Sequence, residues 1–176
     1  MGNSGSGKST LARRISDAIG VERHELDAIQ HQPDWTPIDP PEFLRRVEAI
    51  AAGEGWVVDG NYREVVVEGP VWERADTIVW LDLPRRTVMR QVIWRTVSRG
   101  MRCQELWNGN RESLRNLLSW DPERSVVRWA WTQHGKYRRR YGAAMASPPH
   151  EGVRFVHLTS HAEADRWLAS IGDGAS

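Results

Sequence analysis

Apolar and polar positions alternate along the chain in blocks that predict helices and strands in turn. Apolar residues at helical spacing predict helices over 10–19, 40–52, 85–99 and 162–171. Short apolar runs bounded by turn residues predict strands over 56–58, 77–83 and 153–158, and a short strand that ends in an acid is expected over 21–27. Two more helices are expected within 111–146, with a break near Asp121-Pro122. Strands that alternate with helices indicate an α/β fold whose parallel sheet is covered on both faces.

Helix boundaries carry signals of their own. Gly20 is placed to end the first helix, because glycine adopts the left-handed conformation that a helix end favours. Asp39 is a candidate N-cap for the second helix, and Glu42 stands where a capping box places its carboxylate. Gly53 and Gly55 are expected to end this helix.

The composition fits one domain over 1–176. A chain of 176 residues has the size of a single domain. No apolar run approaches the ~20 residues that cross a bilayer, so we expect a soluble, cytoplasmic protein without a membrane partner. Cys103 is the only cysteine and the six histidines show no metal-ligand spacing, which argues against disulfide and zinc scaffolds. We expect most of the ten tryptophans in the core or in pocket walls.

Basic residues gather in the middle of the chain. Residues 85–140 hold 14 of the 24 Lys and Arg residues but only four acidic residues. Arg suits bidentate contacts with phosphate, which favours an anionic partner for this region. A GC-rich genome would also enrich Arg, so composition alone leaves both explanations open.

The first nine residues carry the strongest chemical signal. Residues 2–9 match the pattern G-x-x-x-x-G-K-[ST], in which successive backbone N–H groups face a phosphate. Lys8 is expected to reach the β- and γ-phosphates of ATP and Ser9 to bind Mg²⁺, at the positive end of the helix that follows. The start of the chain also satisfies the N-myristoylation pattern, a match that is accidental if Gly2 belongs to the phosphate loop. The candidate nucleotide-binding residues here are Gly2, Asn3, Ser4, Gly5, Ser6, Gly7, Lys8, Ser9 and Thr10.

Further segments resemble the P-loop kinase group that contains adenylate, shikimate and gluconate kinases. The chain is most similar to the adenylate-kinase-like topology modulation proteins of the FlaR type, over Gly2 to about Leu168. The resemblance rests on Leu26-Asp27, Trp56-Val57-Val58-Asp59-Gly60-Asn61-Tyr62, Leu81-Asp82-Leu83-Pro84-Arg85-Arg86 and Leu106-Trp107-Asn108-Gly109-Asn110-Arg111-Glu112. It implies the three-layer P-loop NTPase fold with strand order 2-3-1-4-5, an acceptor arm at about 28–55 and a helical lid at about 96–112.

In that fold an apolar strand in the middle of the sheet runs into the first glycine of the loop. Here only Met1 precedes Gly2. The first strand is therefore expected to be missing or truncated, and we expect five to eight apolar residues to be encoded upstream and in frame.

The resemblance also implies roles for individual residues on the donor side. Asp59 matches the acid that holds Mg²⁺ through water; a strand-end Asp that caps a turn is the alternative. Arg95 matches an arginine that contacts ATP, whereas Gln91 stands where the family usually has another arginine. Arg63 falls at a phosphate-binding position, or is a surface arginine. The contact that the family's second arginine makes, and that Gln91 does not supply, would come from Arg90, Arg99 or Arg111. Arg95 and Arg111 are the candidate catalytic residues of the lid.

The acceptor side differs from true adenylate kinases. Residues 24–30 do not match the segment that binds the nucleoside monophosphate there. Asp27 instead resembles the strand-end Asp that orients the acceptor hydroxyl in shikimate and gluconate kinases, with a turn cap as the alternative. His31 and Trp35 are candidate walls of the acceptor pocket, although a loop histidine is more often solvated.

Two functions remain open on the sequence. The first is a kinase that transfers the γ-phosphoryl group of MgATP to a small-molecule or nucleotide acceptor, with Lys8, Asp27 and Asp59 as catalytic residues beside the two arginines. The second is an ATP-binding regulator that acts on DNA through Arg138–Arg140 and the nearby tryptophans at 129 and 131. No nucleic-acid-binding motif accompanies this basic cluster.

Overall fold

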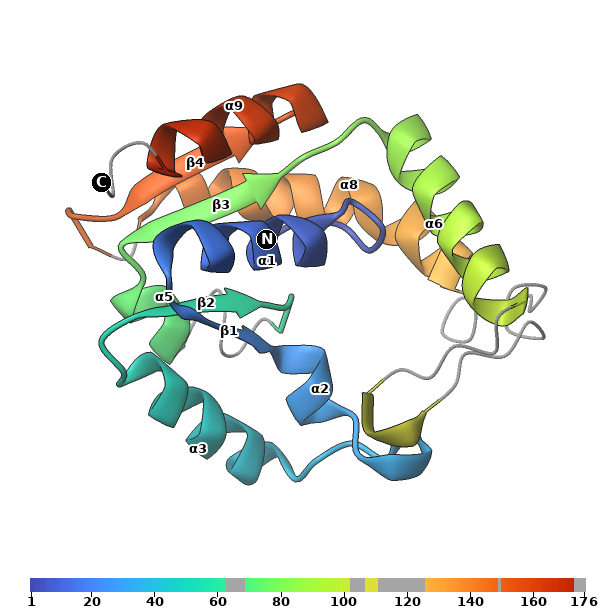
Figure 1. Cartoon of the computed structure of the whole chain (residues 1–176), viewed down its shortest axis with the longest axis horizontal. Helices are drawn as coiled ribbons and strands as arrows, with labels where there is room; N and C mark the ends of the chain where they lie inside the picture. Colours follow the sequence, from blue (N-terminus) through green and yellow to red (C-terminus); the bar gives the residue numbers. More distant parts are fainter. Residues whose placement is uncertain (63–68, 102–106, 111–125, 149, 173–176) are drawn as a thin grey trace.

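Four parallel strands, joined in two pairs, form the centre of the structure (Figure 1). The computed structural model describes residues 1–62, 69–101, 107–110, 126–148 and 150–172. Strand β1 (Glu22–Glu25) pairs with β2 (Trp56–Asp59), and β3 (Thr77–Leu81) pairs with β4 (Arg154–Leu158). The predicted α/β class and the parallel direction of the strands are confirmed.

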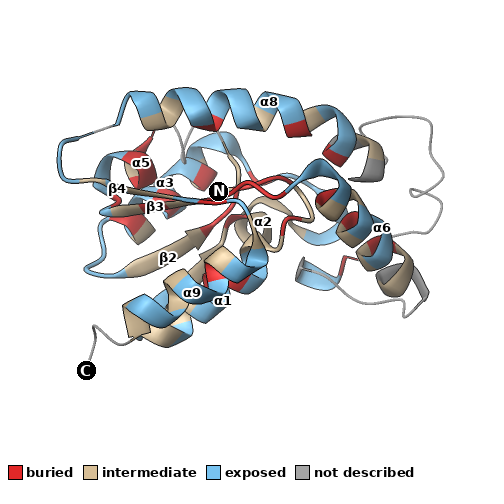
Figure 2. Cartoon of the chain, turned by 90° about the horizontal axis from the view of Figure 1, so that it is seen from above, coloured by how far each residue is buried: buried red, intermediate tan, exposed pale blue. Residues whose placement is uncertain are grey.

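Helices cover both faces of these strands, as expected. Seen from above, α8 lies on one side of the strands, and α1 and α9 lie together on the other (Figure 2). The helices are α1 (Lys8–Ile19), α2 (Leu26–Gln30), α3 (Pro40–Ala51), α5 (Pro70–Arg74), α6 (Arg85–Met101), α8 (Val126–Ala146) and α9 (His161–Gly172), with short 3-10 turns η1 (Pro33–Trp35) and η2 (Trp107–Gly109). The described elements agree with the predicted helices and strands to within a few residues, except for α2 and α5, which were not predicted.

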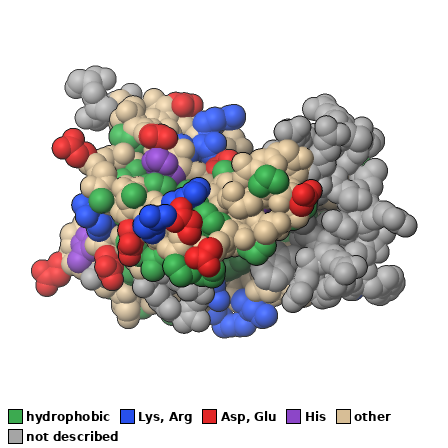
Figure 3. All heavy atoms as spheres, turned by 90° about the horizontal axis from the view of Figure 1, so that it is seen from below, with side chains coloured by type: hydrophobic (Ala, Val, Ile, Leu, Met, Phe, Trp, Pro, Cys, Tyr) green, Lys and Arg blue, Asp and Glu red, His purple; other side chains and the backbone are tan. Residues whose placement is uncertain are grey.

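The capping box expected at the start of α3 does not form. Asp39 precedes the helix but makes no side-chain hydrogen bond to it. Glu42 turns instead toward Arg45 and Arg46 on its own helix. Hydrogen bonds from these two arginines hold the pKa of Glu42 below its ordinary value. The ion pairs within α3 therefore form in place of the capping box. On the face of the molecule seen in Figure 3, acidic and basic side chains lie interspersed.

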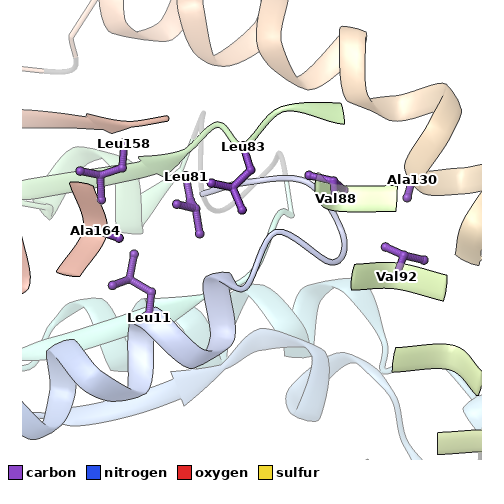
Figure 4. Close-up of a cluster of buried hydrophobic side chains, with 8 residues drawn as sticks. All are labelled: Leu11, Leu81, Leu83, Val88, Val92, Ala130, Leu158 and Ala164. Carbon is purple, nitrogen blue, oxygen red and sulfur yellow. The ribbon is translucent and has the colours of Figure 1, made fainter. Parts of the chain in front are cut away.

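A buried apolar cluster joins the second strand pair to the helices around it (Figure 4). Its members come from α1, β3 with the segment after it, α6, α8, β4 and α9: Leu11, Leu81, Leu83, Val88, Val92, Ala130, Leu158 and Ala164. Burying a leucine or valine side chain contributes roughly 1.5–3 kcal/mol, so the cluster stabilises the packing of α6 with α1, β3 and β4. Trp72 and Trp80 are buried as expected, whereas Trp35, Trp94 and Trp131 are exposed.

Met1 and Gly2 lie between the two strand pairs. The amino group of Met1 donates to the carbonyl oxygen of Val79, and the Leu81 N–H donates to the Met1 oxygen. Gly2 forms an isolated parallel bridge with Leu81. On the other side, the Asn61 amide donates to the Gly2 oxygen at 2.7 Å. Met1 and Gly2 thus fix the position from which the loop that precedes α1 leaves the strands.

Candidate functional site

The segment from Gly2 to Gly7 forms a tight loop that leads directly into α1. The Ser6 N–H donates to the Asn3 oxygen at 3.1 Å, and the Ser4 N–H donates to Asn3 Oδ1 at 2.9 Å. Gly5 has φ +79°, and a Cβ atom there would lie 2.1 Å from the Val92 side chain. Glycine is therefore required at this position by both conformation and space.

The first turn of α1 presents the chemistry of an anion site. The helix begins at Lys8 after Gly7, which has a left-handed conformation and makes no side-chain cap. No acidic residue occupies the first turn, so the free N–H groups and the positive end of the helix dipole are not neutralised locally. Ser9 and Thr10 are exposed there and Lys8 is half-buried. The N-terminal end of α1 therefore offers an environment that suits the oxygens of a phosphate group.

Two other helices reach this loop. Arg95 of α6 donates to Ser4 Oγ at 3.3 Å, which brings the predicted ATP-contacting arginine to the loop. Gln91, one turn earlier, lies 2.7 Å from His161 Nε2, the first residue of α9. His161 also approaches Gly7, since its Cε1 lies 3.5 Å from where a Cβ of Gly7 would be. The sequence analysis missed His161, although its place three residues after the end of a predicted apolar strand was a usable signal.

Asp59 ends β2 and is buried, with 7% of its surface exposed. Its Oδ2 lies 3.9 Å from Arg23 Nη1, which also pairs with Glu25 at 2.6 Å. Asp59 lines the same cavity as Lys8. The structure therefore brings the two predicted donor-side residues to one place, with Arg23 as a neighbour that the sequence analysis did not single out.

Asp27 lies in the first turn of α2 rather than at the end of a strand. β1 stops at Glu25, so the predicted strand over 21–27 is too long at its end. The Tyr62 hydroxyl donates to Asp27 Oδ1 at 2.8 Å. Burial, and then the negative charge of Asp27, raise the pKa of Tyr62, so this hydroxyl keeps its proton and remains a donor. This hydrogen bond orients Asp27, and within the described part of the chain it engages Oδ1 alone.

Asn61, next to Tyr62, makes a similar orienting contact with the start of the loop at Gly2. Its amide donates to Gly2 and its Oδ1 accepts from the buried Tyr141 hydroxyl at 3.0 Å. Burial raises the pKa of Tyr141 as well. Two consecutive residues after β2 therefore orient the start of the loop on one side and Asp27 on the other.

Two asparagines from the region expected to be a lid bind the segment 28–35, which belongs to the expected acceptor arm. Asn108 donates to the carbonyl oxygens of Ala28 and His31, at 3.1 and 2.5 Å. The buried Asn110 donates to the Gln32 oxygen at 2.9 Å and accepts from the Trp35 N–H at 2.8 Å. His31 packs edge to face against Trp35. Residues 107–110 thus belong with the acceptor arm.

Residues 96–101 of the expected helical lid form the end of α6. The remainder of the proposed lid, 102–106 and 111–112, lies outside the described residues, and so does Arg111. Arg63 and the side chain of Arg99 lie outside them too. Of the predicted lid arginines, Arg95 is the one that the described part of the chain brings to the loop.

The basic cluster on α8 is partly neutralised. Arg138 Nε lies 3.0 Å from Oδ2 of the buried Asp82, which also contacts His157 at 3.2 Å. Trp131 is exposed, and the Arg85 guanidinium carbon lies 3.4 Å from its ring centroid. The positive charge of Arg138 is therefore paired with the buried carboxylate of Asp82.

Within the described ranges, no group of three or more His, Cys, Asp and Glu residues gathers in a way that would hold a metal ion. None of the helices described is both long enough and apolar enough to cross a membrane. No protein-family model, curated protein or solved structure matches the chain.

Proposed function

We propose that the chain is a P-loop kinase that transfers the γ-phosphoryl group of MgATP to a small-molecule or nucleotide acceptor. The observation that carries this proposal is the loop from Gly2 to Gly7, which leads into an uncapped helix start with Lys8 in the first turn. A loop of this form at a helix start is suited to phosphate. Arg95 beside Ser4 supplies a second positive charge.

The arrangement of the strands supports the corresponding fold. The pairs β1-β2 and β3-β4 are parallel, and Met1 and Gly2 lie between them. If those two residues mark the place of a first strand, β1, β2, β3 and β4 become the second to fifth strands. The order across the sheet is then 2-3-1-4-5, the order expected for the kinase branch of P-loop proteins. This finer assignment is part of the proposal.

Phosphoryl transfer requires mainly positioning and neutralisation of charge. In the proposed mechanism Lys8 and Arg95 contact the phosphate oxygens. The acceptor oxygen forms a bond to the γ-phosphorus while the bond from that phosphorus to the bridging oxygen of ADP breaks. Asp27 orients the acceptor hydroxyl and takes its proton. Since the Tyr62 hydroxyl bonds to Oδ1, Oδ2 is the oxygen that would bond to the acceptor.

The hydroxyl of Ser9 and the carboxylate of Asp59 fit a magnesium ion by type, since Mg²⁺ prefers oxygen donors and takes few of them from the protein. These two residues would hold the ion, directly or through water. When bound, Mg²⁺ neutralises charge on the β- and γ-phosphate oxygens. The alternative, a regulator acting on DNA, draws less support, because Arg138 pairs with Asp82.

The test is a screen of acceptors with ATP and Mg²⁺, measured as release of ADP. Nucleosides, nucleotides, sugars and hydroxy acids form the panel, and each hit is repeated with Asp27→Asn. We expect one class of acceptor to raise ADP release well above hydrolysis, and Asp27→Asn to remove that increase. If no acceptor raises ADP release and the protein binds duplex DNA with a strong salt dependence, the regulator is the better proposal.

A further inference from the structure

The expected acceptor arm holds a tryptophan on a strained turn. Asp34 and Trp35 have φ of +58° and +57°, a left-handed conformation that residues other than glycine rarely adopt. A bridge between His31 and Pro37 closes the turn, and the Trp35 N–H donates to Asn110 Oδ1 at 2.8 Å. Backbone strain of this kind persists only where surrounding contacts impose it, and it is most frequent at functional sites. The turn is therefore a candidate for a binding role.

The indole of Trp35 is open to solvent and adjoins the turn of helix that carries Asp27. Trp35 is 41% exposed, and its ring packs edge to face against His31 at a centroid distance of 5.3 Å. The His31 N–H donates to the Asp27 carbonyl oxygen at 3.0 Å, which places His31 one helical turn after Asp27. Residues four apart on a helix lie on the same face. Asp27, His31 and Trp35 thus form a row that leads from the carboxylate to the exposed indole.

The sequence around this row carries negative charge without a matching positive charge. No Lys or Arg occurs within 24–44, whereas five acidic residues do. The arginines on either side already have partners, since Arg23 pairs with Glu25 at 2.6 Å and two arginines of α3 pair with Glu42. A phosphate group on the acceptor would meet like charge along this segment, which is unfavourable. The segment therefore favours an acceptor without a phosphate of its own.

We propose that the acceptor is an uncharged nucleoside, whose base stacks on Trp35 and whose hydroxyl group meets Asp27. This inference rests on the proposed function, in which Asp27 orients the acceptor hydroxyl. An exposed aromatic ring is a platform on which any of the bases can stack, because each base has a flat π-face. In the reaction the hydroxyl oxygen bonds to the γ-phosphorus, its proton passes to Asp27 and ADP leaves, so the products are ADP and a nucleoside monophosphate.

The experiment measures binding and turnover separately, so that this inference and the proposed kinase activity can fail separately. The full chain is first saturated with Mg²⁺ and a non-hydrolysable ATP analogue, which fills the donor site. Calorimetry then compares adenosine, guanosine, cytidine, uridine and thymidine with their 5′-monophosphates and with glucose. We expect one nucleoside to bind roughly 10-fold or more tighter than its own monophosphate and than glucose. With ATP in place of the analogue, the same nucleoside should raise ADP release.

Variants of Trp35 test the stacking contact. Trp35→Ala should weaken nucleoside binding by about 10-fold or more and leave the affinity for the ATP analogue unchanged. Trp35→Tyr keeps an aromatic face and should restore most of the loss. Trp94→Ala removes an indole that is 71% exposed on α6, and as the matched control it should bind nucleoside like the unmodified chain.

The outcomes separate the two proposals. Tighter binding of a monophosphate or of glucose than of every nucleoside would overturn the nucleoside inference, and so would unchanged nucleoside binding by Trp35→Ala. A chain that binds no nucleoside but releases ADP with another acceptor would overturn it as well, while the kinase proposal stands. Nucleoside binding that depends on Trp35, with no acceptor raising ADP release, would support the nucleoside site and overturn the kinase.

Discussion

The amino group of Met1 makes a quantitative prediction about the pH dependence of stability. Burial lowers the pKa of this group from 8.0 to about 6; Asp59 opposes the shift and Lys8 adds to it. A change of one in pKa corresponds to about 1.36 kcal/mol, so the change at Met1 corresponds to roughly 3 kcal/mol. This is the free energy by which folding disfavours the charged amine.

The sign follows from proton binding. Between pH 6 and 8 the unfolded chain binds a proton at this amine and the folded chain does not, so the free energy of unfolding rises as pH rises. Below about pH 6 both states are protonated and the full penalty applies, and above about pH 8 neither is. Acetylation of the amine removes the charge and keeps an N–H that donates to Val79.

The assay is denaturant unfolding of the free and the acetylated chain at pH 5.5, 7 and 8.5. The acetylated chain should be more stable by ~2–3 kcal/mol at pH 5.5, and the pH-dependent part of this difference should vanish by pH 8.5. Any contribution of the acetyl group that does not change with pH cancels in this comparison. Parallel pH profiles for the two chains would refute the reasoning.

Three further predictions concern the site. Asp27→Asn should cut transfer to the acceptor by roughly 10² or more and leave ATP affinity nearly unchanged; a stable variant with normal turnover would exclude the role of Asp27. Asn110→Ala leaves the Gln32 carbonyl and the Trp35 N–H without this partner, so it should lower the free energy of unfolding by ~1–3 kcal/mol and speed proteolysis within 31–37. Unchanged digestion would contradict the role of the two Asn110 hydrogen bonds. Gly5→Ala should weaken MgATP binding, because the added methyl group meets Val92; unchanged affinity in calorimetry would count against the loop geometry.

Much of the fold could be predicted because local patterns govern it. The boundaries of α1 and α3 follow from helical periodicity and from the glycines and prolines at their ends. α2 could not be predicted in this way, since five residues are too few to show a period, and Asp27 was consequently assigned to a strand. Local pattern fixes the larger elements and leaves the short ones to tertiary packing.

The site was predictable only in its continuous part. Residues 2–9 are adjacent in the chain, so a motif reveals them. The contacts of Asn61 with Tyr141, and of Asn108 with the acceptor arm, join residues about 80 positions apart. No spacing rule covers such pairs. The ion pair of Arg138 with Asp82 could not be predicted either, because nothing in the run of three arginines at 138–140 indicates which of them pairs with a distant carboxylate.

The most direct test of the phosphate-binding account is calorimetric titration with MgATP of the unmodified chain, Lys8→Ala and Lys136→Ala. The chain has only these two lysines, and Lys136 lies exposed on α8, so its variant controls for the loss of one positive charge. Removing a preorganised charged donor is worth ~3 kcal/mol, so Lys8→Ala should lose on the order of 100-fold in phosphoryl transfer, measured as ADP release on the same samples. We predict that Lys136→Ala binds MgATP and releases ADP like the unmodified chain. Equal binding and equal ADP release by Lys8→Ala would contradict the account.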